Sequence, residues 1–299
     1  MVGAGGWARS YIRTIAALED VRLAVLYRRA PGAVSGLPRD CRVALFAPEA
    51  IDHASIDGLI VATPPSVHAA IAQAALERGV PVLIEKPMTL DVEEARLLTV
   101  AARARNVVAM VDHTHLFHPA FEELKSIVQN SGGPDGVTSI RAQGGNRGPI
   151  RTDTSALWDW GAHDVAMVLD LMGAKPATIR GESQVVGNGE RVRLIFGYTS
   201  GTDVEIDICN ARARPVRSFS VACGGETYIY DDQATAKLRS GARMIPVSAE
   251  LPLTRVVKSF AEAIRSGDIA RSGLDFGLSV VEILAACEKS IVTKEMVRL

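Results

Sequence analysis

Short apolar runs alternate with helical patterns through the first third of the chain. The runs are rich in valine, isoleucine and leucine, as parallel strands buried on both faces are, and they lie at 21–27, 43–46, 58–62, 80–84 and 107–111. Between them, apolar residues recur at helical spacing in 8–16, 66–78 and 91–105. The alternation predicts βαβ units and a doubly wound parallel sheet, the α/β architecture of a Rossmann domain.

The pattern changes near Pro119. A helix predicted at 120–129 ends at the breaker 130–134, and we place a domain boundary between residues 118 and 119. The next β-rich runs, joined by tight glycine turns, lie at 137–143, 178–186, 191–198, 203–209, 218–223 and 227–230. They predict a C-terminal α+β domain, residues 119–299, with a largely antiparallel open sheet. Helices predicted near 158–172, 253–265 and 274–291 would cover one face, and the last could pack back on the first domain, residues 1–118.

The charge balance is nearly even, with 33 basic and 34 acidic residues. Such a chain has no global field to attract nucleic acid or an anionic membrane, so a small-molecule partner is expected. The sequence has no signal-peptide pattern and no run of the ~18 apolar residues that a membrane span needs, and its four cysteines are scattered. These features predict a cytoplasmic protein. Only two residues precede the first glycine, so either the first strand is very short or the native start lies upstream of Met1.

A glycine motif opens the chain. Gly3-Ala4-Gly5-Gly6-Trp7-Ala8 fits G-x-G-x-x-A, which lets the backbone approach a pyrophosphate at a helix N-terminus. Gly3, Gly5, Gly6, Trp7 and Ala8 are therefore candidate cofactor-binding residues. A tight strand-to-helix turn that binds no ligand gives the same pattern.

The end of the second strand bears on the choice of cofactor. NAD enzymes usually place a carboxylate there for the adenosine ribose, whereas this chain has Tyr27-Arg28-Arg29. Two guanidinium groups in that place favour NADP over NAD, because Arg28 and Arg29 could bind the 2′-phosphate while Tyr27 stacks near the adenine. Solvated loop arginines are the alternative.

Two further segments carry a family resemblance. Ala62-Thr63-Pro64-Pro65-Ser66-Val67-His68, followed by Glu85-Lys86-Pro87, resembles the Gfo/Idh/MocA oxidoreductases, as do 159–164, 273–278 and 285–290. The resemblance implies a nucleotide-binding domain joined to an open antiparallel sheet, with the nicotinamide between them and Lys86 beside the ring. It adds Thr63, Pro64, Pro65, His68, Glu85 and Lys86 to the candidate cofactor-binding residues.

The same resemblance implies a catalytic set of Lys86, Asp159 and His163. Spacing supports the last two independently, because residues four apart share a helix face. Imidazole can exchange a hydroxyl proton near neutrality, so we expect His163 to be the acid/base, Lys86 to stabilise the developing alkoxide and Asp159 to orient substrate or histidine. The lysine and histidine roles could be exchanged. A surface pair or a core histidine is the alternative for Asp159 and His163.

The chain departs from many relatives at Ala166, where they carry a second aspartate; Asp164 instead follows His163 directly. The segment 156–164 looks more like members that act on sugar nucleotides or similar activated sugars. Candidate substrate-binding residues are His113, Arg147, Arg151 and Trp158, with solvated arginines and a core tryptophan as alternatives. The histidines at 113, 115 and 118 lack a clear fourth ligand, so we reject a metal site and expect them to line the cleft.

The sequence thus predicts an NAD(P)-dependent dehydrogenase or reductase of CH–OH groups on a sugar, sugar nucleotide or related polyol. Two alternatives remain open, a non-catalytic dinucleotide-sensing regulator and an NAD-dependent glycosidase of the same superfamily. A homodimer or homotetramer is expected from family analogy.

Overall fold

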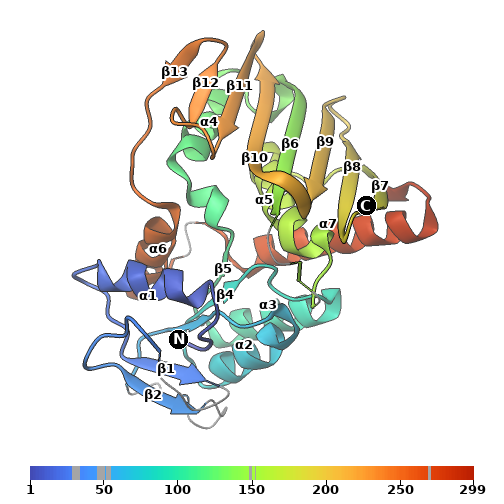
Figure 1. Cartoon of the computed structure of the whole chain (residues 1–299). Helices are drawn as coiled ribbons and strands as arrows, with labels where there is room; N and C mark the ends of the chain where they lie inside the picture. The colour runs from blue at the N-terminus through green and yellow to red at the C-terminus, as the bar shows by residue number, and fades with distance from the viewer. Residues whose placement is uncertain (29–33, 46–50, 52–54, 148–149, 152, 269–270) are drawn as a thin grey trace. The chain divides into compact units, whose positions relative to one another are not determined.

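The computed structural model describes residues 1–28, 34–45, 51, 55–147, 150–151, 153–268 and 271–299 (Figure 1). Contacts divide the chain into two units, which are described separately. The first holds Met1–His113 and Leu251–Val281, and the second holds Thr114–Glu250 and Glu282–Leu299. The sequence predicted one domain boundary, between residues 118 and 119, and that domain boundary stays a prediction. The units defined by contacts instead divide the chain between residues 113 and 114, and residues 251–281 also belong to the first unit.

The first unit is built on a parallel sheet. Its strands are β1 (Val25–Arg28), β2 (Arg42–Leu45), β3 (Leu59–Val61), β4 (Val82–Glu85) and β5 (Ala109–Asp112). Val2 bridges both Tyr27 and Val61 in parallel and so lies between β1 and β3. The resulting order, β2-β1-Val2-β3-β4-β5, is that of a doubly wound dinucleotide-binding sheet. The first strand is therefore a single bridging residue, which suits the short segment before Gly3.

Helices accompany these strands. They are α1 (Ala8–Ala16), α2 (His68–Glu77), α3 (Val92–Arg105), α6 (Pro252–Ser266) and the start of α7 (Leu274–Thr293). Those at 8–16, 68–77 and 92–105 agree with the prediction, whereas the helix at 252–266 was expected to cover a face of the second sheet and instead lies in this unit, in contact with the helix at 8–16. Asp91 caps the N-terminus of α3, because its side chain accepts a hydrogen bond from the Glu94 amide, and Asn106, in the left-handed conformation, caps the C-terminus. Strands β3, β4 and β5 are buried throughout, which explains why they are apolar up to the carboxylates Glu85 and Asp112 that end β4 and β5.

The second unit contains a nine-stranded sheet in the order β13-β12-β11-β10-β6-β9-β8-β7-β14 (Figure 1). All neighbouring pairs are antiparallel except β6 with β9, which are parallel. The strands are β6 (Val137–Arg147), β7 (Thr178–Val186), β8 (Gly189–Gly197), β9 (Asp203–Cys209), β10 (Ala211–Cys223), β11 (Glu226–Asp231), β12 (Leu238–Ser240), β13 (Arg243–Ile245) and β14 (Val297–Arg298). The predicted fold class, a Rossmann sheet followed by a largely antiparallel sheet, is confirmed.

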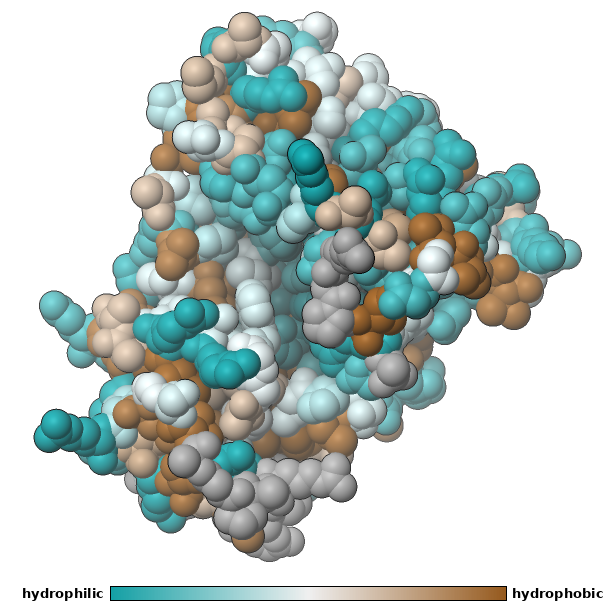
Figure 2. Space-filling model, in the orientation of Figure 1, coloured by the Kyte–Doolittle hydropathy of each residue, from teal (hydrophilic) through white to brown (hydrophobic). Residues whose placement is uncertain are grey.

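Alternating side chains give this sheet two different faces. Along β8, Val192, Leu194 and Phe196 are buried, whereas Arg191 and Arg193 lie on the other face and pair with carboxylates of β9. Figure 2 shows a largely hydrophilic surface over β8 and β9. The buried face packs against α4 (Pro119–Asn130) and α5 (Ala162–Met172).

Three features of the second unit were not expected from the sequence. The pair β12–β13 and the two-residue β14 are too short and polar to give a strand pattern. The helix expected from residue 158 begins instead with a π-helical turn, Leu157–Gly161, that leads into α5.

Among the described residues, no helix is both long and apolar enough to cross a membrane.

Candidate active site

The glycine turn of the first unit leaves its backbone open. A Cβ atom at Gly5 or Gly6 would meet nothing within 4 Å, and helix α1 begins after Trp7 with no side-chain cap and no acid in its first turn. An uncapped helix N-terminus beside bare glycines is suited to a pyrophosphate. Gly3 has a different role, because its φ is +106° and a Cβ there would lie 2.2 Å from the carbonyl oxygen of Ala62. That glycine is required by packing of the turn itself.

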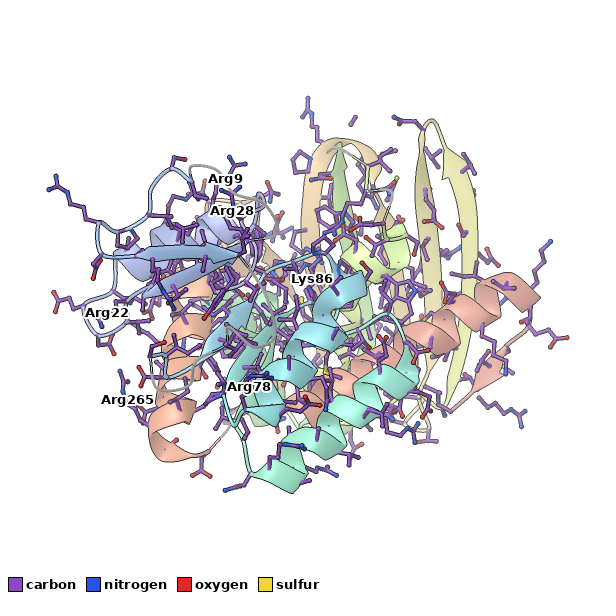
Figure 3. All side chains as sticks on the ribbon, turned by 90° about the horizontal axis from the view of Figure 1, so that it is seen from below. Arg9, Arg22, Arg28, Arg78, Lys86 and Arg265 are labelled. Carbon is purple, nitrogen blue, oxygen red and sulfur yellow. The ribbon has the colours of Figure 1, made fainter. Side chains whose placement is uncertain are left out.

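The residues expected at the adenosine end are placed only in part. Arg28 ends β1 and is half-buried, whereas Arg29 lies outside the described residues. Tyr27 is completely buried, so the structure assigns it to the core rather than to stacking on an adenine. The exposed Arg9 in the first turn of α1 is a further basic residue of this unit that the sequence analysis did not single out; Figure 3 labels it with Arg28 and Lys86.

Orphaned polar atoms gather where the parallel strands end. Thr63 Oγ1 after β3, Glu85 Oε1 at the end of β4, and both ring nitrogens of His113 after β5 are buried without a hydrogen-bond partner among the described residues. Buried polar groups in native proteins are nearly always hydrogen-bonded. Ligands of doubly wound sheets bind outside the carboxyl ends of the strands. These unsatisfied groups therefore fit the polar edge of a nicotinamide dinucleotide.

Lys86 follows Glu85 at this edge and influences two buried neighbours. Burial, and after it the positive charge of Lys86, lower the pKa of His113 to about 3, so the imidazole is neutral. The ring of His113 packs edge-on against Phe276, with 5.6 Å between centroids. Burial, and then the charge of Asp112, raise the pKa of Glu85 well above its usual range, while Lys86 opposes that rise.

Tyr11 of α1 belongs to the same buried group. Its hydroxyl donates to Asp112, which ends β5 directly opposite Glu85 in the register of the parallel pair. Burial, with the Asp112 and Glu85 carboxyls beside it, raises the pKa of Tyr11 well above its usual range. The sequence analysis missed Tyr11 and Asp112, although a carboxylate at the very end of an apolar strand was a visible signal.

His68 was expected to bind cofactor, but the structure gives both of its ring nitrogens other partners. Nδ1 lies 2.9 Å from the carbonyl oxygen of Pro87, and Nε2 lies 2.9 Å from that of Thr63. The side chain is completely buried, because it begins α2 beneath both loops. His68 therefore joins the Thr63 and Lys86 loops from within. Of the adjoining prolines, Pro64 is exposed and Pro65 is buried at the start of a 3₁₀ turn.

In the second unit, Asp159 and His163 have different neighbours. Asp159 lies in the π-helical turn, and its Oδ1 is 3.9 Å from Nη1 of Arg151. His163 lies in α5, and its ring is edge-on to that of His115, with 4.8 Å between the ring centroids. A π turn closes its hydrogen bond one residue later than an α turn, so the spacing of four does not by itself align these side chains. The α-helical argument for this pair was incomplete for that reason.

His115 connects His163 to the sheet. Its Nδ1 lies 3.1 Å from the hydroxyl of Tyr230 on β11. His118 instead caps α4 by accepting from the amide of Ala120, and its Nε2 lies 3.4 Å from Asp232. The histidines at 113, 115 and 118 thus make separate contacts.

The two tryptophans of the turn differ in exposure. Trp158 is 5% exposed and its indole N–H donates to Glu288 of α7 at 3.0 Å, so the structure favours the core alternative over stacking on a substrate. Trp160 is half-buried, and the guanidinium of Arg217 lies 5.3 Å from its ring centroid.

Asp164 forms a buried ion pair with Arg217 of β10. The Nη1–Oδ1 distance is 2.6 Å, and the two side chains are 0% and 4% exposed. Burial raises the pKa of Asp164, although Arg217 beside it acts in the opposite direction. A Cβ at Gly144 would lie 2.9 Å from Asp164 Oδ2, so β6 needs a glycine there. The pair ties the start of α5, and with it His163, to the sheet.

The expected substrate arginines are also placed. Arg151 donates two hydrogen bonds to Asp153, at 2.9 and 2.6 Å, so an anionic substrate would have to compete with this carboxylate. Arg147 ends β6 opposite Ala211, but its side chain lies outside the described part of the structure.

Comparison with known proteins settles the class of the chain. Residues 1–113 match the Gfo/Idh/MocA model, described as an oxidoreductase family with an NAD-binding Rossmann fold. A crystal structure from Magnetospirillum magnetotacticum MS-1, described as that of an oxidoreductase, is 38% identical with a TM-score of 0.88, covering 96% of this chain and 97% of that one. The chain belongs to the Gfo/Idh/MocA oxidoreductase family.

Two relatives are named as dehydrogenases. The UDP-N-acetylglucosamine 3-dehydrogenase of Acidithiobacillus ferrooxidans is 27% identical over 74% of this chain and 69% of that protein. The inositol 2-dehydrogenase of Rhizobium meliloti is 22% identical over 99% and 97%. The expectation of an enzyme acting on CH–OH groups with a nicotinamide dinucleotide agrees with both names and with the family description.

Proposed function

We propose that this oxidoreductase moves hydride between a nicotinamide and a hydroxyl-bearing carbon of a sugar, sugar nucleotide or related polyol. The observation that carries the proposal is the group of unsatisfied polar atoms at the ends of β3, β4 and β5, next to Lys86. The relatives named for a nucleotide sugar and an inositol supply the substrate class. The open glycine turn supports a dinucleotide as the second ligand.

The residues divide the chemistry between them. A bound nicotinamide supplies the hydride acceptor in oxidation and the donor in reduction. As hydride leaves carbon, the hydroxyl proton passes to His163, and the ammonium of Lys86 stabilises the developing alkoxide. Asp159 orients substrate or histidine, and neutral His113 offers one hydrogen-bond acceptor and one donor to the ligands.

We further propose NADP as the preferred cofactor. Arg28 ends the strand where an NAD enzyme carries an acid, and Arg9 adds a second positive charge in the first turn of α1. A homodimer or homotetramer and a cytoplasmic location, suggested by the resemblance and the sequence, stay predictions.

The test is turnover with NADPH, NADH and their oxidised forms on a panel of keto- and hydroxy-sugars, nucleotide sugars and inositols. Lys86→Met and His163→Asn should each lower kcat by about 10²–10⁴-fold, whereas Lys289→Met, an exposed lysine of α7, should not. Full turnover by both site variants would refute the assigned roles.

Two other results would replace the proposal. Tight dinucleotide binding with no turnover on any substrate, together with a co-purifying protein, would indicate a regulator. Release of a glycosidic leaving group with no net change in nicotinamide absorbance would indicate a glycosidase.

A further inference from the structure

A cavity of about 500 Å³ opens on the solvated face of the nine-stranded sheet. Gln184, Arg191 and Cys209 are register partners on β7, β8 and β9, so their side chains form one row across this face. Helix α5, which carries His163, packs against the other face. The cavity is therefore separate from the candidate active site, and its volume is in the range of sites for small molecules.

Three arginines line this cavity. Arg191 extends from β8, whereas Arg212 and Arg214 come from the irregular stretch of β10 between Ala211 and Val216. The pairing of β10 with β6 shifts its register over that stretch. The irregular stretch thus brings two guanidinium groups to the row that holds Arg191.

A single carboxylate neutralises part of this charge. Asp207 accepts two hydrogen bonds from Arg191, at 2.9 and 2.7 Å, and its Oδ2 lies 3.2 Å from Nη2 of Arg212. Arg214 is exposed and forms no ion pair in the described parts of the chain. Three guanidinium groups and one carboxylate leave a net charge of +2 at the cavity.

Neighbouring acidic residues on this face already have arginine partners of their own. Glu205 lies 2.7 Å from Arg193, and Glu182 lies 3.7 Å from Arg180. These pairs are balanced, so the unbalanced positive charge belongs to the cavity and not to the whole face.

The arginines keep hydrogen-bond donors for a ligand. Arg212 donates through Nε to the carbonyl oxygen of Gly144 at 3.3 Å and through Nη2 to that of Asp207 at 3.2 Å. Arg191 uses Nε and Nη2 on the Asp207 carboxylate. Nη1 of both arginines, and the whole guanidinium of Arg214, make no hydrogen bond within the described residues. Guanidinium forks match phosphate oxygens, so an anion can bind here without breaking any of these contacts.

The remaining wall of the cavity is apolar, with Val186, Val216, Ala211 and Ala213 lining it. A phosphate monoester carries a charge of about −1.5 to −2 at pH 7, which matches the +2 of the cavity, whereas a carboxylate supplies only one negative charge. We propose that this cavity binds a phosphate monoester of a small organic molecule, with the phosphate on the three arginines and the carbon skeleton against the valines. The proposal does not depend on the proposed function.

Valine methyl NMR of the cofactor-free protein tests this site with glucose 6-phosphate as the probe. The methyl resonances of Val186 and Val216, assigned with Val186→Ile and Val216→Ile, should shift saturably with a Kd of about 1 mM or below. Glucose should cause no shift. Glucuronate, with one negative charge, should bind at least about tenfold more weakly. No saturable shift, or equal affinity for glucuronate, would overturn the inference.

Inorganic phosphate tests the apolar wall. It carries the charge without a carbon skeleton, so it should bind more weakly than glucose 6-phosphate. Equal affinity for the two would overturn the assignment to an organic phosphate.

Variants test the arginines. Arg214→Met should weaken binding of glucose 6-phosphate by about tenfold or more, since hydrogen bonds to a charged group are lost, and Arg214→Lys should recover part of that loss. Arg214 is exposed, so neither change disturbs the core. The control Arg193→Met removes an exposed arginine of the same face and should leave the Kd unchanged. Equal weakening by Arg214→Met and Arg193→Met would overturn the site.

Two further results separate this site from phosphate binding in the first unit and from the proposed function. Arg28→Ala, at the expected adenosine end, should leave the Val186 and Val216 shifts unchanged, and loss of the shifts in that variant would overturn the inference. The measurement needs no turnover. Saturable shifts in a protein that oxidises or reduces no sugar would refute the proposed function alone.

Discussion

The most quantitative prediction concerns His113. Its ring is 1% exposed, its nitrogens have no hydrogen-bond partner in the described parts of the chain, and its pKa is lowered to about 3. In the unfolded chain the same imidazole takes up a proton near pH ~6.5. Between these two values only the unfolded state is protonated. The stability contributed by neutral His113 is therefore present above about pH 6.5 and is lost as the pH falls below it.

The size of the loss follows from the two pKa values. At pH 5, protonation of an unfolded imidazole with a pKa of ~6.5 stabilises the unfolded state by about 2 kcal/mol, against about 0.2 kcal/mol at pH 7. Wild type should therefore lose about 2 kcal/mol more unfolding free energy between pH 7 and 5 than His113→Phe does. Phenylalanine keeps a ring against Phe276 and does not titrate.

Urea denaturation of the cofactor-free protein at pH 7 and pH 5 measures the loss of unfolding free energy in wild type and in His113→Phe. Met110→Leu is the matched control, because Met110 is buried, does not titrate and lies on β5, the strand that His113 follows; between pH 7 and 5 this variant should lose as much stability as wild type. An equal loss in wild type and His113→Phe would mean that the folded protein protonates His113 freely, which would refute the burial argument. The variant should also bind dinucleotide about tenfold more weakly, since it cannot hydrogen-bond the ligand.

The remaining predictions test the cofactor and the buried ion pair. Arg28→Ala should raise the KM for NADP by about tenfold or more with little change in the KM for NAD, because a charge-assisted hydrogen bond contributes about 1.5–3 kcal/mol. The control Arg22→Ala removes an exposed arginine of the same unit and should leave both KM values unchanged. Equal effects of Arg28→Ala on both cofactors would contradict the NADP preference. Arg217→Met should destabilise the protein by about 3–5 kcal/mol in urea by leaving Asp164 buried without its partner. Arg193→Met removes a half-exposed pair and should cost at most about 1 kcal/mol, so equal losses would contradict the role of burial.

Local patterns were sufficient for most of the fold. Runs such as 82–84 and 109–111 are apolar because both sheet faces are covered, and β8 alternates because one face is solvated. Apolar spacing alone predicts no strand at Val2, which the structure places between β1 and β3. At the π-helical turn 157–161, Gly161 packs so closely on β9 that a Cβ there would lie 3.1 Å from Ile208, a contact between residues far apart in sequence.

In the candidate site too, some properties follow from the sequence and others only from the tertiary structure. The sequence by itself determined the chemical types: a glycine turn, a lysine after a buried strand, histidines at 113, 115 and 118, and an aspartate and a histidine within 157–164. Only the tertiary structure decided how deeply each side chain is buried and what it is paired with. It buried Tyr27 and Trp158, satisfied His68 with two carbonyl oxygens, and set Glu85 beside Asp112 and Tyr11. Burial, hydrogen bonding and pKa depend on neighbours that are distant in sequence, whereas helix and strand periodicity depends on near ones.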